Sequence, residues 1–367
     1  MRHVLAGLAL ILAPPALAQQ QQVSFQVEDF ATGLERPWGA AFLPDGRMLV
    51  TERPGRVRVV GPDGAVSPPL SGAPEVVAMS QGGMLDVAVA PDFATTREVY
   101  LCHSAAVRGG SLTRLTRARL SADATALERT TPILDATPAQ PRGAQHYGCR
   151  IAFGPDGAMY LSTGDRNVDR HRAQRLDDLA GKVLRLARDG APLADNPMAG
   201  QPGARAEVFT HGHRNPQGLA FNPWTGSLWE VEFGARGGDE VNVLRPGRNY
   251  GWPVVAHGVN YDGSRISESS SRPGMEDPIH HWVPAVSPSG IAFYTGDAFP
   301  AWRGSLFLAA LNPPGLVRLT TDGDRVTGEE RLLWNRARFR DVLQGPDGLL
   351  YILTDEARGR ILRLRPE

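Results

Sequence analysis

The chain has 367 residues, of which 42% are hydrophobic and 21% charged, and its 39 basic and 39 acidic side chains leave no net charge. This length is enough for a well-buried core. The balance argues against a protein that binds nucleic acid, because neutralising phosphates needs a surplus of basic residues. Two cysteines exclude a disulfide-dense scaffold. Lys182 is the one lysine, so lysine chemistry is confined to a single position.

The first 18 residues have the layout of a secretory signal peptide. A short basic start precedes an apolar run over residues 4–12, and small residues follow at positions 16 and 18. The run is too short for a permanent membrane-spanning helix, and no later run of about 18 apolar residues exists. We therefore expect a signal peptide over residues 1–18 and a single mature domain over 19–367. That domain is expected in the bacterial periplasm, where disulfides can form, without membrane insertion.

The body of the chain repeats a strand, turn and strand pattern six times. Three copies place Pro-Asp-Gly between apolar runs, at 44–46, 155–157 and 346–348. Proline presets φ for such a turn and glycine accepts the positive φ. The six units begin near residues 40, 85, 151, 219, 291 and 342. Small sheets repeated in this way predict an all-β fold, a six-bladed β-propeller, with a pair of β-sandwiches as the competing architecture.

A propeller must close its ring, and residues 23–27 could supply a strand to the last blade. Helix is expected to be scarce: residues 174–180 allow one or two turns at most. Residues 210–218 and 267–275 are expected to be loops. The long gaps between repeats leave room for loops that carry a functional site.

Polar residues gather in the loops beside the predicted strands. Gln81 precedes two glycines, and His146 lies just before the third repeat, where an imidazole is suited to general-base chemistry near neutral pH. The segment 211–218 holds two histidines without a third metal ligand at zinc spacing. Its Arg214 and Asn215 suit an anionic or carbonyl-rich ligand better.

Two further segments suggest cation and anion binding. The glycine-rich residues 232–240 offer backbone carbonyls together with Asp239 and Glu240, which could hold a hard cation such as Ca²⁺. Near the C-terminus, alternate positions of an extended segment point the same way, so Arg336, Arg338 and Arg340 form a positive row suited to carboxylates. The chain has no Gly-x-Ser-x-Gly elbow, phosphate-binding loop or Rossmann glycine pattern, which disfavours serine hydrolysis and nucleotide cofactors.

Taken in order, these motifs resemble the soluble, pyrroloquinoline quinone (PQQ)-dependent glucose/sorbosone dehydrogenase family, in particular its aldose sugar dehydrogenase branch. The specific blocks are Gly212-His-Arg-Asn-Pro-Gln-Gly218 and Asn249-Tyr-Gly-Trp-Pro253. The others are Gln81-Gly-Gly, His146, Gly181-Lys-Val-Leu-Arg185, Gly237-Gly-Asp-Glu-Val-Asn242 and Arg338-x-Arg340-Asp341. The resemblance covers about residues 30–365. It implies a six-bladed propeller that oxidises aldose sugars at the anomeric carbon to lactones, with hydride transfer to PQQ.

The resemblance also implies a role for each matching residue. His146 takes the proton of the anomeric hydroxyl, Arg214 stabilises the charge that develops on the quinone, and Gln81 lies beside the active histidine. The implied contacts with PQQ come from Gln81, Arg214, Asn215, Tyr261, Arg338 and Arg340.

The same resemblance implies two Ca²⁺ ions. The backbone carbonyls of Gly234 and Ala235 hold the ion that binds PQQ. Glu240 and the carbonyl of Tyr250 match a second, structural ion.

Three positions depart from the glucose-specific members of that family. Gln145 stands where they have Asp, and Arg166 stands where they have Gln, so both alter the expected sugar pocket. The segment 311–315 lacks their PQQ-contacting lysine, and Asn312 or backbone N–H groups are the candidates to replace it.

Two other functions remain open at this point: a Ca²⁺-dependent propeller lactonase, and a propeller that binds sugars or proteins without catalysis. As a dehydrogenase, the protein would act on aldoses and pass electrons to an external quinone, cytochrome or dye, because the chain has no Cys-x-x-Cys-His haem motif. Either a monomer or a homodimer is expected.

The two cysteines are predicted to pair. Equivalent strands of adjacent propeller blades lie side by side, which brings Cys102 near Cys149. A disulfide there would support the loop of His146; the alternative is two free buried thiols.

Overall fold

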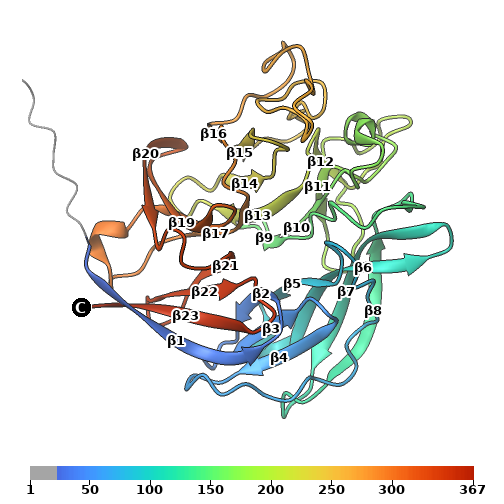
Figure 1. Cartoon of the computed structure of the whole chain (residues 1–367). Coiled ribbons are helices and arrows are strands. Elements are labelled where there is room, and N and C mark those ends of the chain that lie inside the picture. Colours follow the sequence, from blue (N-terminus) through green and yellow to red (C-terminus); the bar gives the residue numbers. More distant parts are fainter. Residues whose placement is uncertain (1–22) are drawn as a thin grey trace, which may run out of the picture.

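Six antiparallel sheets surround a central axis in the computed structural model, which describes residues 23–367 (Figure 1). The predicted signal peptide lies outside the described residues and stays a prediction. Each of the six sequence repeats begins the innermost strand of one sheet, so the predicted six-bladed propeller is confirmed. No helix in the described part of the chain has the length and hydropathy that a membrane-spanning helix needs.

The strands of the first three blades follow in chain order. The first blade contains β2 (Pro37–Phe42), β3 (Met48–Glu52) and β4 (Arg56–Val60). The second contains β5 (Met84–Val89), β6 (Glu98–Val107), β7 (Gly110–Leu120) and β8 (Leu127–Asp135). The third contains β9 (Ile151–Phe153), β10 (Met159–Thr163), β11 (Lys182–Leu186) and β12 (Val208–His211).

The remaining blades continue the pattern, and the last one takes its outer strand from the N-terminal end of the described chain. The fourth blade contains β13 (Pro216–Phe221), β14 (Leu228–Glu232), β15 (Asp239–Leu244) and β16 (His280–Trp282). The fifth contains β17 (Pro288–Phe293), β18 (Leu306–Leu311), β19 (Pro314–Asp322) and β20 (Arg325–Leu332). The sixth contains β21 (Phe339–Gln344), β22 (Leu350–Thr354), β23 (Gly359–Pro366) and β1 (Phe25–Leu34).

The two ends of the described chain close the ring. β1 pairs antiparallel with β23, with Phe25 opposite Pro366 and Leu34 opposite Gly359, and Figure 1 shows the two strands alongside each other. The prediction of a closing strand near residues 23–27 is confirmed, and the strand extends further than predicted. The inner strand β2 packs against both β5 and β21, so the first and last blades are neighbours. A closed ring excludes a pair of β-sandwiches.

The hydrophobic core lies between the blades. Trp229 and Trp282 of the fourth blade pack with Phe293 and Leu308 of the fifth, and the rings of Trp229 and Phe293 are 5.3 Å apart in an edge-on arrangement. Burying a side chain of this size stabilises the fold by about 1.5–3 kcal/mol. Each blade therefore needs a neighbour on both faces, which is the physical reason for closure.

Helical structure is as scarce as expected among the described residues, but the predicted position of the helical turn was wrong. The elements are α1 (Phe93–Thr96) and two short 3₁₀ helices, η1 (Arg170–Gln174) and η2 (Pro300–Trp302). The turn expected over 174–180 lies earlier, because the Asp169 side chain caps η1 by accepting from the His171 N–H. The loop expected over 210–218 is shorter than predicted, since β12 and β13 occupy both of its ends.

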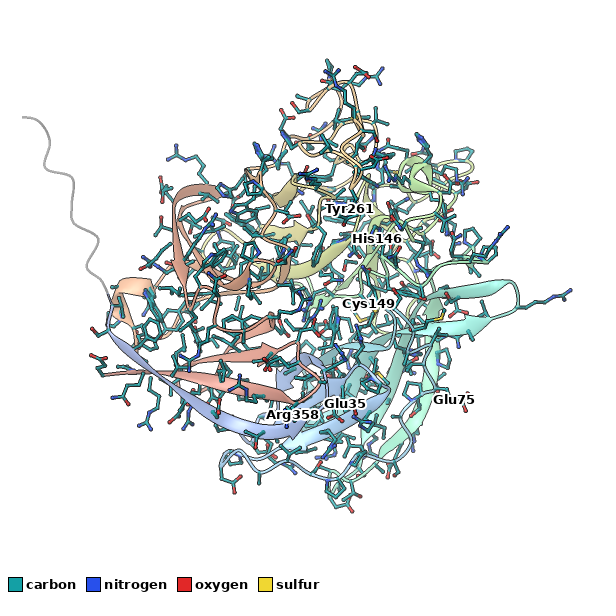
Figure 2. All side chains as sticks on the ribbon, in the orientation of Figure 1. Glu35, Glu75, His146, Cys149, Tyr261 and Arg358 are labelled. Atoms are coloured by element: carbon teal, nitrogen blue, oxygen red, sulfur yellow. A yellow bond between two sulfur atoms is a disulfide. The ribbon has the colours of Figure 1, made fainter. Side chains whose placement is uncertain are left out.

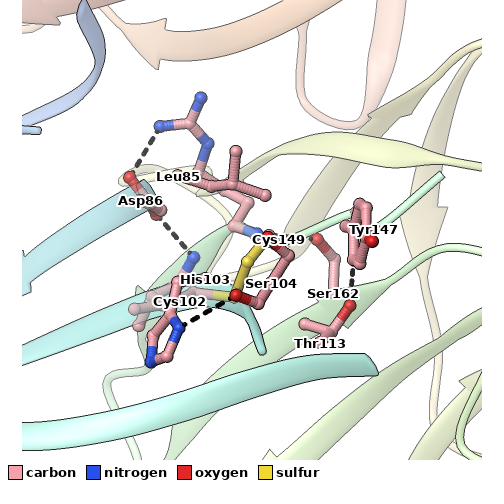
Figure 3. The surroundings of a disulfide bond; sticks show 12 residues. Leu85, Asp86, Cys102, His103, Ser104, Thr113, Tyr147, Cys149 and Ser162 are labelled. Atoms are coloured by element: carbon pink, nitrogen blue, oxygen red, sulfur yellow. Dashed lines mark hydrogen bonds and ion pairs between the residues drawn. A yellow bond between two sulfur atoms is a disulfide. The ribbon is translucent and has the colours of Figure 1, made fainter. Parts of the chain in front are cut away.

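A disulfide joins Cys102 of β6 to Cys149, which lies just before β9, with their Cα atoms 5.6 Å apart (Figure 3). The predicted pairing is confirmed. The bridge closes a loop with a sequence separation of 47 residues. In the chain-entropy model, such a loop is worth about 4 kcal/mol of stability. Nearby, the Thr113 hydroxyl donates to the Tyr147 carbonyl at 2.7 Å, so the segment after His146 is anchored twice to the second blade.

Candidate active site

A polar cavity of about 390 Å³ lies where the inner strands begin. Its wall combines residues from five blades, including Trp38 at the start of β2, Gln81 just before β5 and Asn215 just before β13. Of the residues predicted to contact PQQ, the lining includes Gln81, Asn215, Arg338 and Arg340. Among these predicted residues, Gln81 and Arg340 are 259 positions apart in the chain (340 minus 81).

His146 is held beside this cavity by its backbone. Its φ is +50°, in the left-handed region, and its N–H donates to Gln81 Oε1 at 2.8 Å. Gly164 packs against it so closely that a Cβ at that glycine would lie 2.2 Å from the His146 carbonyl oxygen. Asn215 accepts from the Gly148 N–H at 3.1 Å. Two predicted site residues, Gln81 and Asn215, therefore fix the loop of His146.

The side chain of His146 is paired with Asp165, a residue to which sequence reasoning gave no role. Nδ1 of His146 lies 2.7 Å from Asp165 Oδ1, and both side chains are buried. An ionised carboxylate only accepts hydrogen bonds, so Nδ1 carries the proton and Nε2 keeps its lone pair. Trp252 Nε1 donates to the other oxygen of Asp165 at 2.7 Å. The arrangement presents a neutral, oriented imidazole that can accept a proton.

The electrostatics agree with this assignment. Burial lowers the pKa of His146, and the positive charge of Arg214 lowers it further. Burial alone would raise the pKa of Asp165, but His146 and Arg214 together hold it below its usual value. Asp165 is therefore ionised and His146 neutral near pH 7.

Arg214 lies next to this pair. Its guanidinium is 5.3 Å from the Trp252 ring, and its Nη1 donates to the carbonyls of Phe233, at 3.0 Å, and of Gly234. Gly234 is one of the two residues whose carbonyls were predicted to hold Ca²⁺. The structure thus places a fixed positive charge where the sequence predicted a cation.

Behind Arg214, three glutamates of the fourth blade form an acidic cluster. Glu232 lies opposite Glu240 in the β14–β15 ladder, and Glu230 lies opposite Asn242. Loss of water on burial raises the pKa of Glu232 to about 8 and raises the pKa values of Glu230 and Glu240 well above their usual value. Ligand atoms of His213, Glu230 and Glu232 lie within 4.8 Å of one another.

This cluster is short of positive charge. Oε1 of Glu230 and Oδ1 of Asn242 are buried, and neither has a hydrogen-bond partner among residues 23–367. Unpartnered buried oxygens are costly unless a proton or a cation satisfies them, and oxygen ligands are those that Ca²⁺ prefers. The donor set therefore fits a hard cation next to Glu240. The sequence analysis did not identify Glu230. Its signal in the sequence is the pair of acidic residues at alternate positions, 230 and 232, within an apolar strand.

The predicted arginine row is only partly at the cavity. Arg338 and Arg340 both pair with Asp355, at 3.2 and 2.9 Å, and Arg338 also donates to the Leu311 carbonyl. Arg336 lies before β21, is exposed and does not line the cavity. The strand that would have extended the row begins only at Phe339.

Like His146 and Arg214, three further predicted residues lie outside the wall of this cavity. Tyr261 is 73% exposed, on a loop that appears above His146 in the view of Figure 2. Asn312 is exposed and follows Leu311, which does line the cavity. Tyr250 stacks on His213 beside the acidic cluster, with ring centres 4.9 Å apart.

Arg166, Gln145 and Lys182 are engaged with the protein itself. Arg166 donates to the carbonyls of Ser111 and Gln145, and its guanidinium lies 3.7 Å from the Tyr147 ring centre. Gln145 Oε1 accepts from Asn167 at 2.6 Å. Lys182 is buried and its Nζ donates to three backbone carbonyls. The lysine therefore has a structural role, and the Arg166 side chain is turned toward the second blade.

Comparisons with known proteins point to one family. A family model described as Glucose / Sorbosone dehydrogenase matches residues 34–363. The chain is 42% identical over 345 residues to "Aldose sugar dehydrogenase YliI" of Escherichia coli (strain K12), covering 93% of this chain and 92% of that protein.

Solved structures agree. The chain superposes with a TM-score of 0.91 and 40% identity on the soluble aldose sugar dehydrogenase (Asd) of Escherichia coli in the apo-form, covering 94% of this chain and 100% of that one. It superposes with a TM-score of 0.80 and 31% identity on the PQQ-bound form of the aldose sugar dehydrogenase (Adh) of Streptomyces coelicolor, covering 97% and 100%.

Proposed function

Because this chain belongs to the Glucose / Sorbosone dehydrogenase family, we propose that it is a PQQ-dependent dehydrogenase that oxidises aldose sugars at the anomeric carbon to lactones. The observation that carries the proposal is the buried His146–Asp165 pair beside an arginine-lined cavity. The pair provides a base, and the cavity provides charge complementary to an anionic cofactor.

The cavity suits PQQ, an aromatic quinone with three carboxylates. Arg338 and Arg340 would bind carboxylate groups, and Asn215 and Gln81 would donate hydrogen bonds from the same wall. Tyr261 and Asn312 are further proposed contacts, which their exposed loops would have to bring inward. When bound, PQQ supplies the acceptor for the hydride of the sugar.

The residues of the chain then divide the work. His146 Nε2 accepts the proton of the anomeric hydroxyl, and Asp165 stabilises the imidazolium that results. Arg214, which stacks near Trp252, stabilises negative charge developing beside it. Gln81 holds the His146 backbone and so keeps the base in position.

Two Ca²⁺ ions belong to the proposal. The carbonyls of Gly234 and Ala235 would hold one at the cofactor, which requires the Arg214 guanidinium to release the Gly234 carbonyl; the ion would then polarise a bound carbonyl group. Glu240 and the Tyr250 carbonyl would hold the other, and the unpartnered oxygens of Glu230 and Asn242 support a cation there.

An external acceptor would receive the electrons, since the chain has no haem attachment motif. We propose a periplasmic location, which the Cys102–Cys149 disulfide supports, because such bonds persist in oxidising compartments. Either a monomer or a homodimer is compatible with this activity.

Reconstitution tests the function. Apoprotein with PQQ and Ca²⁺ is expected to reduce a dye when aldoses are added, and to show none of this activity if PQQ is omitted. Hydrolysis of sugar lactones with Ca²⁺ alone would instead identify a lactonase. Sugar binding without either reaction would identify a binding protein.

A further inference from the structure

Two arginines outside every sequence motif line the same cavity as Arg338 and Arg340. Arg36 lies just before β2, and Arg53 lies in the turn between β3 and β4, so both come from the first blade. That blade packs against the sixth blade, which carries Arg338 and Arg340. The four guanidinium groups therefore reach the cavity from two neighbouring blades.

The backbone holds Arg36 and Arg53 in place. The Arg53 N–H donates to the Arg36 carbonyl at 3.1 Å, and the Arg53 carbonyl accepts from the Met84 N–H at 3.0 Å. Gly83 lies so close that a Cβ there would be 2.1 Å from the Arg53 carbonyl oxygen. The turn is thus fixed to the start of β5, and the side chain of Arg53 leaves from a rigid position.

Neither side chain has a partner within residues 23–367: no hydrogen bond or ion pair involves the guanidinium of Arg36 or Arg53. Other arginines of the same blade differ. Arg56 pairs with Glu52 at 2.6 Å, and Arg58 with the same carboxylate at 3.3 Å. An arginine without a carboxylate, beside a polar cavity, is available to a ligand.

The charge of the cavity is strongly unbalanced. Its wall holds Arg36, Arg53, Arg338 and Arg340 but only one acidic residue, Asp355, which leaves an excess of three positive charges (four minus one). Burial lowers the pKa of Arg53; Asp355 opposes this, while the other three arginines of the wall lower it further. Four clustered guanidinium groups repel one another unless a polyanion binds among them.

We propose that Arg36 and Arg53 bind a carboxylate of PQQ and provide the positive charge that the lysine-free segment 311–315 lacks. Leu311 of that segment lines the same cavity, so Arg36 and Arg53 face the same space as the segment that lacks the lysine. The inference rests on the proposed function, because it names further residues for the same cofactor. The three carboxylates of PQQ are complementary to the excess of positive charge on this wall.

Equilibrium binding tests the inference without relying on turnover. Apoprotein is titrated with PQQ in Ca²⁺ buffer while tryptophan fluorescence is recorded, since Trp38 lines the cavity. Arg53→Gln and Arg36→Gln are each expected to raise the Kd for PQQ by about tenfold or more, as one charge-assisted hydrogen bond is lost. Arg53→Lys keeps the charge and is expected to recover part of the affinity. The salt dependence of the Kd should weaken in Arg53→Gln, because one ionic contact is gone.

Arg47→Gln is the matched control. Arg47 belongs to the same blade but lies in the β2–β3 turn, where it pairs with Asp45 at 2.7 Å, outside the cavity. Its Kd should equal that of the unmodified protein. If the unmodified protein binds PQQ and both Arg36→Gln and Arg53→Gln bind it equally well, the inference is overturned and the function stands. If the unmodified protein does not bind PQQ, the proposed function fails. Should Arg53→Gln not fold, Arg36→Gln and Arg53→Lys decide the question by the same titration.

Discussion

Nδ1 of His146 lies 2.7 Å from Oδ1 of Asp165, and both side chains are buried, with the His146 N–H bonded to Gln81 of the cavity wall. The two residues are neighbours because the loop before β9 and the end of β10 meet in one blade. This pair sets the tautomer and the charge of the proposed base.

Replacing Asp165 tests the orientation of the base. Asp165→Asn removes the negative charge and allows the wrong tautomer of His146, so kcat should fall by about 100-fold or more, as expected for loss of an oriented general base. PQQ affinity should change little, since Asp165 does not line the cavity. Steady-state kinetics together with PQQ titration separate the two quantities.

Asp177→Asn is the control for this substitution, because Asp177 is exposed on the following loop. Equal kcat values for Asp165→Asn and Asp177→Asn would contradict the assigned role of Asp165.

The pH profile reports the pKa of His146. Burial and the charge of Arg214 place that pKa below the ordinary value of 6.5, so the neutral imidazole persists below that pH. We expect the acid limb of kcat/KM to have its midpoint below pH 6.5. The measurement is kcat/KM against pH in buffers of constant ionic strength. An acid limb centred above pH 6.5 would show that the environment raises the pKa instead.

The acidic cluster of the fourth blade predicts stabilisation by Ca²⁺. Removing the ion with a chelator should lower Tm, and restoring it should reverse the change. At a Ca²⁺ concentration 100 times its Kd, the gain is about 2.7 kcal/mol. Glu230→Gln removes one of the unpartnered acceptors and should reduce the Ca²⁺-dependent shift of Tm to less than half.

Glu268→Gln changes an exposed glutamate and should keep the full Ca²⁺-dependent shift of Tm. If Ca²⁺ does not change the Tm of the unmodified protein, or if Glu230→Gln keeps the full shift, the cluster does not bind a cation.

Loss of the disulfide should weaken both the fold and the position of His146. Replacing Cys102 and Cys149 by serine is expected to cost about 2–5 kcal/mol in the free energy of unfolding. Denaturant unfolding measures this cost, and the replacement should also lower kcat, because Cys149 lies three residues after His146. In the unmodified protein, titration with a thiol reagent under denaturing, non-reducing conditions should find no free thiol; two reactive thiols would contradict the bridge.

The sequence by itself determined the repeat and therefore the fold. Pro-Asp-Gly turns act through φ values and hydrogen bonds of adjacent residues, as in the 44–46 turn, where Leu43 donates to the Arg47 carbonyl. The apolar strands on both sides of such turns form sheets that must bury both faces against neighbouring sheets. Six such sheets can all do so when they close into a ring. His146, Arg214 and the arginine row could be predicted as site residues from the sequence, because they interrupt this apolar pattern.

Only the tertiary structure decided which charges meet. Arg53 and Arg340 lie 287 positions apart (340 minus 53) and face one cavity because the first and sixth blades are neighbours. Asp165 joins His146, and Glu232 meets Glu240, through strand pairing rather than through spacing in the chain. Strand ends at 210–218 were likewise set by pairing across the sheet, which overrode the glycine and proline of that segment. Local turn chemistry follows from neighbouring residues, whereas the balance of charge in a buried site follows from packing between blades.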